Sequence, residues 1–204
     1  MSFGVRRLLG AAGFYDWFQK VVGAERTRAT LARDYIRARP RDRVLDIGCG
    51  TGRMLAYLPA VEYYGFDLSA DYIAAARRRH GARGLFWQER VTSASLTKVQ
   101  PCDIVLAVAV LHHLDDAEAL QLFELARGAL RPGGRLVTYD ACYTATQSRL
   151  ARWIVSRDRG QHVRREAEYR ALAERVFHQV CSAIWESPLR IPYTSITMEC
   201  QRAV

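Results

Sequence analysis

The chain has 204 residues, half of them hydrophobic and a quarter charged, with a formal net charge of +9. This size and composition are typical of one soluble globular domain with a full hydrophobic core. No apolar run approaches the ~20 residues of a membrane span, and the N-terminus lacks the apolar core and cleavage site of a signal peptide.

The positive charge comes almost entirely from arginine. One interpretation is a nucleic-acid partner or an acidic substrate, with the Arg-rich segment 149–175 as a candidate surface. We favour the other, compositional bias with arginines spread over solvated helix faces. The five cysteines form no C-x-x-C pair and are odd in number, so we expect no disulfide framework, no metal site and a cytoplasmic location.

Helical periodicity dominates the chain before the first strand. Apolar side chains recur at helical spacing over 14–22, and a second helical stretch is closed by Pro40. We expect this pair to pack over the ligand edge of the sheet. Trp17 and Phe18 fall on the core-facing stripe. Tyr15 and Asp16 lie off it and are better candidates for facing a pocket.

A short apolar, β-branched stretch, 43–47, predicts a strand buried on both faces. Three glycines follow at alternate positions, Gly48, Gly50 and Gly52, and an amphipathic segment over 54–58 then begins a helix. Glycine allows the backbone to turn sharply and lets a ligand lie against it. Strand, glycine turn and helix are typical of a nucleotide-type site in an open α/β sheet.

A second strand is predicted over 62–67 and ends in Asp67, about 20 residues further on, where a carboxylate can accept hydrogen bonds from ribose hydroxyls. Together the two features predict an adenosine-containing cofactor. Ser69 is then expected to cap a helix that runs to about Arg79, and a third strand is expected over 85–88.

The apolar run 103–110 predicts a fourth strand, again buried on both faces. Asp115 and Glu118 have the spacing of a capping box, which opens a helix that runs to about Leu130. Pro132-Gly133-Gly134 then turns into a fifth strand, 135–139.

The tail, 141–204, predicts two helices, around 150–154 and 169–177, and two alternating strands, 180–185 and 193–200, that suit a hairpin. The expected fold is α/β: a doubly wound, seven-stranded, mostly parallel sheet with an antiparallel C-terminal hairpin, in three α/β/α layers. Ligands bind beyond the carboxyl ends of the strands at the switch point, here between strands one and four.

The third glycine comes one residue too early for a dinucleotide fingerprint, and no P-loop is present. The run Asp46-x-Gly48-x-Gly50-x-Gly52 instead resembles the first motif of the class I S-adenosylmethionine (SAM)-dependent methyltransferases. The likeness continues in order through 65–69, 102–106, 110–115 and 130–134.

This resemblance implies a SAM-binding core over 41–204 with a helical insertion at about 144–178, and a helical lid over 1–40. The implied cofactor-binding residues are Asp46, Gly48, Cys49, Gly50, Gly52, Asp67, Leu68, Glu89 and Val108. Within this set, the glycines admit the methionine part of SAM and Asp46 holds its ammonium group. Asp67 takes the ribose hydroxyls, Leu68 packs on adenine, Glu89 contacts the adenine amino group and Val108 lies near the sulfonium. Cys49 fits as a small side chain in a tight place.

His112 and His113 are the candidates for a general base, because imidazole titrates near physiological pH and both follow strand four. The alternative is that one of them only bonds the backbone of its loop. A metal site built from these histidines with Asp115 and Asp116 is not favoured, because adjacent side chains diverge. Asp140 and Tyr143 are candidates for binding the acceptor, whereas Tyr139 is expected in the core or beside the cofactor.

The function predicted is methyl transfer from SAM to an O, N or C atom of a small-molecule acceptor. An RNA-directed methyltransferase is one alternative, and nucleic acid is not favoured because Val110-Leu111-His112-His113 occupies the place of the Asn/Asp-Pro-Pro-Tyr run of base-amino methyltransferases. A non-catalytic SAM-binding relative is the other. The sequence leaves open the acceptor, the atom methylated and the oligomeric state.

Overall fold

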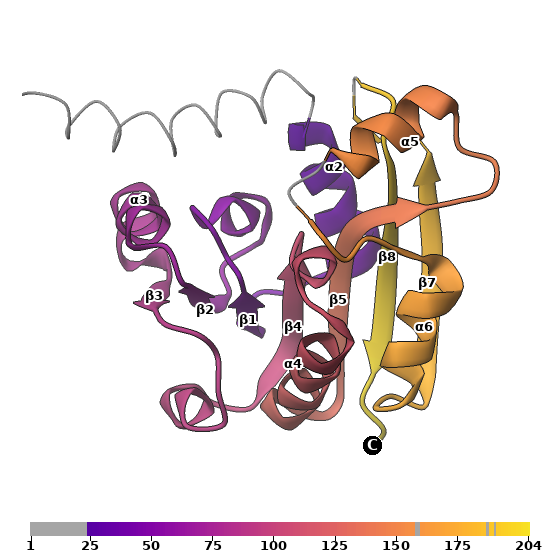
Figure 1. Cartoon of the computed structure of the whole chain (residues 1–204). Helices are drawn as coiled ribbons and strands as arrows, with labels where there is room; N and C mark the ends of the chain where they lie inside the picture. Colours follow the sequence, from indigo (N-terminus) through magenta and orange to yellow (C-terminus); the bar gives the residue numbers. More distant parts are fainter. Residues whose placement is uncertain (1–23, 158–159, 187, 190) are drawn as a thin grey trace, which may run out of the picture.

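A computed structural model describes residues 24–157, 160–186, 188–189 and 191–204. They form a single eight-stranded sheet with helices packed around it (Figure 1). The strand order is β3-β2-β1-β4-β5-β8-β7, with β6 paired to β5 outside this path. The predicted helix over 14–22, with Tyr15, Asp16, Trp17 and Phe18, lies outside the described residues.

The first five strands run parallel: β1 (Arg43–Ile47), β2 (Glu62–Asp67), β3 (Leu85–Gln88), β4 (Cys102–Val108) and β5 (Leu130–Tyr143). Because β1 lies between β2 and β4, the strand order reverses beside it. The switch point is therefore where the sequence predicts it, at the carboxyl ends of β1 and β4.

The last two long strands, β7 (Gln179–Glu186) and β8 (Thr194–Gln201), run antiparallel, and β8 pairs with β5. This confirms the predicted hairpin and the seven expected strands. The eighth strand, β6 (Arg164–Arg165), is a two-residue parallel addition to the end of β5 that the sequence did not predict.

Helices cover both faces of the sheet, which confirms the three-layer prediction (Figure 1). The α-helices are α2 (Ala24–Thr30), α3 (Ala70–His80), α4 (Asp116–Ala129), α5 (Arg149–Ser156) and α6 (Glu166–Glu174). A π-helix (Leu31–Ile36) continues α2, and 3-10 helices span Arg53–Tyr57, Gly81–Arg83, Ser95–Lys98 and Leu111–His113. Within the described part of the chain, no helix is both long enough and apolar enough to span a membrane.

Two buried clusters lie on opposite faces of the sheet. One joins α4 and α6 to the sheet through Phe123, Tyr169 and Phe177. The other joins the α2 segment to the sheet through Leu31 and Ile36. Both caps predicted from sequence are present: Ser69 accepts a hydrogen bond from the N–H of Tyr72, and a capping box opens α4.

Three predicted bounds are wrong. The helix after the glycine turn is only the 3-10 helix Arg53–Tyr57, because Pro59 disfavours helical backbone at the residue before it and Leu58 is extended (φ −97°, ψ 151°). The fourth strand ends at Val108 rather than at residue 110, since Ala109 turns into the left-handed region (φ +59°).

The fifth strand begins at Leu130 rather than at Arg135. Its first residues run beside the start of β4, where Leu130 pairs with Cys102 across an irregular register. A Cβ on Gly134 would lie 3.0 Å from the carbonyl oxygen of Asp103, so this close approach of two backbones requires glycine.

Candidate functional site

The turn after β1 bends through three glycines in the left-handed region, Gly48 (φ +73°), Gly50 (φ +54°) and Gly52 (φ +70°). The N–H groups of Gly48 and Cys49 donate to the carbonyl oxygen of Phe66 at 2.8 and 2.9 Å, which fastens the turn to β2. Residues with a side chain rarely adopt such angles, so the sequence folds this way because it has glycine at each of the three positions.

The three glycines differ in what surrounds them. A Cβ on Gly48 would lie 2.6 Å from Cγ2 of Val110, and one on Gly52 would lie 2.9 Å from Cδ2 of His80. A Cβ on Gly50 would meet nothing within 4 Å. Gly48 and Gly52 thus allow close packing inside the protein, whereas Gly50 presents bare backbone to open space, as a ligand cradle requires.

Asp67 joins this turn to the end of β2. Its Oδ2 accepts from the N–H of Gly50 at 2.9 Å and its Oδ1 accepts from the N–H of Ser69 at 2.8 Å. Each carboxylate oxygen has a second lone pair, so both can accept further hydrogen bonds from hydroxyl groups. Leu68, the next residue, is 63% exposed and can cover the face of a flat ring.

Asp46 lies beneath the turn and is 2% exposed. One of its oxygens, Oδ2, accepts from the hydroxyl of Tyr63, whereas Oδ1 is buried without a hydrogen-bond partner. Burial raises the pKa of this carboxyl to about 7, against the opposing effect of the Tyr63 hydrogen bond, and the nearby charge of Asp67 raises it further. An unpaired, buried carboxylate oxygen is suited to a cation.

Three other predicted cofactor residues lie in different settings. Cys49 is buried, and a Cβ on Gly65 would lie 2.9 Å from its Sγ, so the thiol fills the tight space against β2. Burial raises its pKa, which leaves it protonated and unreactive. Val108 is half-buried at the end of β4. The Glu89 carboxylate forms an ion pair with Nζ of Lys98 at 2.7 Å, and this hydrogen bond lowers its pKa.

The loop after β4 carries the predicted histidines and is held by Asp140. Oδ1 of Asp140 accepts from the backbone N–H of Val110 at 3.0 Å and of His112 at 3.3 Å. Nδ1 of His112 lies 2.9 Å from the same oxygen, and both side chains are almost fully buried. Because Val110 also packs against Gly48, this loop and the glycine turn are in contact.

His113 differs from His112 in exposure. His113 is exposed, and its ring centroid lies 4.2 Å from that of His112. His112 is covered by the segment 160–165: a Cβ on Gly160 would lie 2.1 Å from Cδ2 of His112, and the N–H of His162 donates to the carbonyl oxygen of His112 at 2.9 Å.

Arg164 fastens this segment to the loop. Its guanidinium donates to the carbonyl oxygens of Leu111 at 3.1 Å and Leu114 at 2.7 Å, and forms an ion pair with Asp116 at 2.7 Å. Arg164 itself is 7% exposed. The predicted insertion therefore folds back over the histidine loop, which the sequence alone did not indicate.

Sequence reasoning placed Tyr139 in the core or beside the cofactor but missed the row of polar side chains that continues from it onto β8 and β7. Tyr139 pairs with Val108 on one side and with Thr197 on the other, and Ser195 pairs with Trp185. The hydroxyls of Tyr139, Ser195 and Thr197 are buried without a hydrogen-bond partner, and so is the indole N–H of Trp185. Residues that alternate along a strand share a face, so Ser195 and Thr197 lie on the same side as Tyr139 and Val108. Polar alternation over 195–199 was the available signal.

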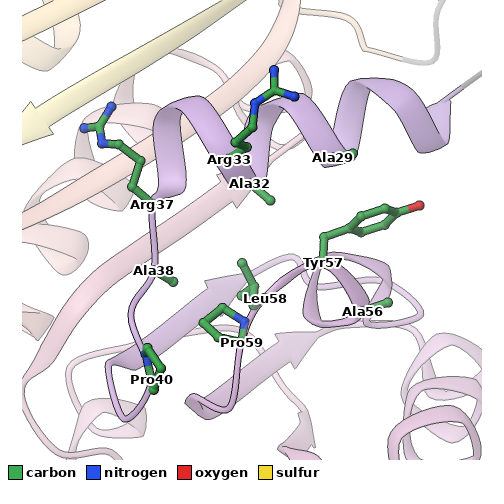
Figure 2. A pocket seen from close by; sticks show the side chains of 10 residues that line it. All are labelled: Ala29, Ala32, Arg33, Arg37, Ala38, Pro40, Ala56, Tyr57, Leu58 and Pro59. Atoms are coloured by element: carbon green, nitrogen blue, oxygen red, sulfur yellow. The ribbon is translucent and has the colours of Figure 1, made fainter.

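A separate pocket of about 520 Å³ lies between the α2 segment and the 3-10 helix Arg53–Tyr57 (Figure 2). It is lined by Ala29, Ala32, Arg33, Arg37, Ala38, Pro40, Ala56, Tyr57, Leu58 and Pro59. None of the predicted site residues lines it. Across the described ranges, no group of three or more acidic, histidine or cysteine side chains is arranged to hold a metal ion.

Comparison with known proteins gives a consistent family. Residues 45–136 match the family model of a methyltransferase domain. The chain is 34% identical over 113 residues to a mouse tRNA (carboxymethyluridine(34)-5-O)-methyltransferase, covering 52% of this chain and 16% of that protein. It is 32% identical over 148 residues to mouse acetylserotonin O-methyltransferase, covering 65% of this chain and 38% of that protein. The chain thus spans well under half of either relative.

Among solved structures, magnesium protoporphyrin IX methyltransferase from Synechocystis with bound S-adenosylhomocysteine (SAH) matches with a TM-score of 0.66 at 19% identity. The match covers 98% of each chain. At this identity the likeness concerns the fold alone, and it supports the class I arrangement of strands and helices over the length of the chain.

Proposed function

We propose that the chain transfers a methyl group from SAM to an O, N or C atom of a small-molecule acceptor, because residues 45–136 match a methyltransferase domain and the chain has the class I fold. The observation that carries the proposal is the pairing of Gly50 with Asp67. The backbone of Gly50 faces open space while its N–H is held by a carboxylate that retains free lone pairs.

The residues around the turn fit SAM. Gly48 and Gly50 give its methionine part access to the backbone, and the unpaired Oδ1 of Asp46 accepts from its ammonium group. Asp67 accepts from the ribose hydroxyls, and the exposed Leu68 packs on adenine. When bound, SAM supplies an electrophilic methyl group on a sulfonium.

The remaining assignments depend on the same orientation. Gly52 and Cys49 shape the turn from inside, and Val108 lies near the sulfonium. Glu89 remains the proposed contact to the adenine amino group, for which it exchanges part of its ion pair with Lys98. A ligand at Glu89 therefore competes with an exposed ion pair, which contributes little to stability.

The acceptor lies beyond Val108, toward Tyr139 and Thr197. Unpaired polar groups in a row from β5 to β8 support an acceptor that offers hydrogen-bonding groups of its own. In this arrangement the protein aligns the acceptor atom with the methyl group and excludes water. Most of its contribution to the rate of methyl transfer comes from this alignment. The lid role proposed for residues 1–40 rests, in the described part, on α2 and Leu31–Ile36, and the segment 160–165 of the proposed insertion covers the histidine loop.

Of the two predicted bases, we assign proton transfer to His113 and positioning to His112. His113 is exposed, so its imidazole can take the proton that an O–H or N–H acceptor loses. His112 is fixed by Asp140 and covered by Gly160. His113→Asn should lower the rate of methyl transfer with an unchanged melting temperature, whereas His112→Asn should lower both, because His112 is fixed by Asp140.

An RNA acceptor is the second candidate, and part of the arginine charge is already used within the protein. Seven of them donate to backbone carbonyl oxygens within the protein: Arg37, Arg77, Arg79, Arg83, Arg135, Arg164 and Arg202. Charge used in this way stabilises the fold rather than a phosphate backbone. All five cysteines are free thiols, which supports a cytoplasmic location.

The test is methyl transfer from SAM labelled on its methyl group. The protein is incubated with cell extract separated into small molecules, RNA and protein, and the label is followed. We expect the label in the small-molecule fraction and SAH in equal amount. Label in RNA would favour the second candidate, and SAM binding without any product would make the chain a non-catalytic relative.

A further inference from the structure

Helix α5 (Arg149–Ser156) is attached to the sheet by one face only. Ala151 and Val155, four residues apart, are buried, and the helix packs against β5 and β8. Leu150 and Trp153 are 54% and 56% exposed. Because residues three apart lie on the same face of a helix, these two side chains form a continuous apolar stripe on the outer side.

Cationic side chains flank the stripe. Arg149, Arg152 and Arg157 are exposed, and residues 148–157 contain no acidic residue. Within the described residues none of the three forms an ion pair. The guanidinium of Arg157 lies 5.3 Å from the ring centroid of Trp153, and that of Arg152 lies 5.1 Å from the ring centroid of Tyr143. Arg152 and Arg157 therefore stack on aromatic rings, Arg149 lies exposed at the start of the helix, and all three keep their charge available to an outside partner.

We propose that α5 docks on the surface of a membrane that contains anionic lipids. In this arrangement Leu150 and Trp153 enter the boundary between headgroups and acyl chains, and the three arginines contact anionic headgroups. An amphipathic helix with Trp and Leu on one face and arginine beside them is suited to this position, in which the helix lies in the plane of the interface. The proposal concerns peripheral binding and does not depend on methyl transfer.

Two other occupants fit the surface less well. A second copy of the chain would bring two sets of three arginines together, and like charges disfavour such contact. A nucleic acid would pair with the arginines and stack on Trp153, but it offers no apolar partner for Leu150. A lipid surface satisfies both the charge and the leucine.

The docking helix follows the end of β5, at the edge of the sheet that carries the glycine turn and the histidine loop (Figure 1). A protein bound through α5 therefore turns this edge toward the membrane. The orientation follows from the topology, since α5 begins shortly after the carboxyl end of β5.

The experiment uses the full chain and vesicles of two compositions, phosphatidylcholine alone and phosphatidylcholine with about one-third phosphatidylglycerol. We expect sedimentation with the anionic vesicles, at least tenfold weaker binding to the neutral ones, and loss of binding as salt is raised. Changing each arginine to Gln should weaken binding about fivefold. Tryptophan fluorescence of the chain should shift to the blue on binding, and Trp153→Phe should remove the shift.

The matched variants are Leu150→Ser with Trp153→Ser, and Leu85→Ser on β3. Leu85 is 57% exposed at the far edge of the sheet, so its change is a control for lost surface hydrophobicity. We expect the double variant to lose at least tenfold in affinity for anionic vesicles with an unchanged melting temperature, and the control to bind normally. The proposal would be overturned by an equal loss of affinity in the double variant and in Leu85→Ser, or by absence of vesicle binding. Binding of the chain to RNA but not to vesicles would also overturn it.

Discussion

The glycine turn and the histidine loop lie at the same edge of the sheet and touch through Gly48 and Val110, yet they are held in different ways. The turn is fixed by contacts within a short stretch of chain: Asp67 holds an N–H 17 residues before it and another 2 residues after it. The loop is fixed from far away, by Asp140 across 28 residues and by Arg164 across as many as 53.

Under the proposed function, this difference separates cofactor binding from acceptor binding. A cofactor shared by a family can be bound by local backbone geometry, which repeats wherever the motif occurs. An acceptor that varies between members is bound by a surface assembled from distant segments. The predictions that follow test whether stability depends on the loop and cofactor affinity on the turn.

The largest effect is expected for Asp140→Ala. The change leaves the N–H groups of Val110 and His112 and the Nδ1 of His112 without their acceptor, in a buried place. We expect the free energy of unfolding to fall by about 3–5 kcal/mol, measured by urea denaturation. Affinity for SAH in the folded protein should change less than tenfold.

The control for this prediction is Thr138→Val on the same strand. Thr138 is fully buried, and its hydroxyl has no hydrogen-bond partner. Removing an unpaired polar group should leave stability within about 1 kcal/mol of the unmodified protein. If Asp140→Ala were as mild as Thr138→Val, the loop would not depend on Asp140.

The second prediction compares two glycines that have the same φ angle. Gly50 and Gly81 both have φ +54° and open space where a Cβ would lie. Alanine should destabilise both, by roughly 1–3 kcal/mol, because of the positive φ, and Gly81→Ala is the stricter control since its ψ of −124° lies outside the left-handed helical region. Only Gly50→Ala should lose SAH binding, by roughly a hundredfold or about 3 kcal/mol, because its Cβ enters the ligand cradle. Calorimetry on both variants distinguishes a cradle from a turn that is merely strained.

The third prediction concerns Asp67→Ala. Loss of the acceptor for the ribose hydroxyls and for the N–H of Gly50 should weaken SAM binding by roughly 1–3 kcal/mol. Glu62→Ala on the same strand is the control, since Glu62 forms an exposed ion pair with Arg43 and a long hydrogen bond, 3.5 Å, from the hydroxyl of Tyr64. Unchanged affinity in Asp67→Ala would remove the ribose assignment.

The smallest effect is a dependence on pH through Asp46. Its pKa is raised to about 7 in the folded protein, so between its ordinary value and pH 7 the folded chain holds a proton that the unfolded chain has lost. The proton on Asp46 favours the folded chain, so its contribution to the free energy of unfolding is fully present at low pH and is lost as the pH rises to about 7. Since a cation requires the ionised carboxylate, SAM affinity should increase about tenfold from pH 6 to pH 8. Asp46→Asn should bind weakly and without this dependence.

The features that could be predicted from the sequence are those fixed by local contacts. Ser69, the capping box of Asp115 and Glu118, and the strand Leu85–Gln88 are set by neighbouring residues, and each was predicted correctly. The apolar pattern after Gly52 predicts too long a helix, because Pro59 disfavours helical backbone at Leu58 and the helix ends at Tyr57.

The rest required the assembled sheet. That His112 is buried against Asp140 and covered by Gly160 follows from the pairing of strands and the return of the insertion, which no local pattern encodes. The role of Arg164 was hidden in an arginine-rich segment whose members have different uses: Arg164 holds the loop, while Arg149 and Arg152 remain on the surface.

The central claim is that the backbone at Gly50 and the carboxylate of Asp67 together bind SAM. Calorimetric titration of the unmodified chain with SAH tests it most directly, with Gly50→Ala and Gly81→Ala measured beside it. We predict saturable heat with one site per chain, with affinity retained in Gly81→Ala and weakened roughly a hundredfold in Gly50→Ala. Absence of heat from the unmodified chain, or equal heat from both variants, would contradict the account.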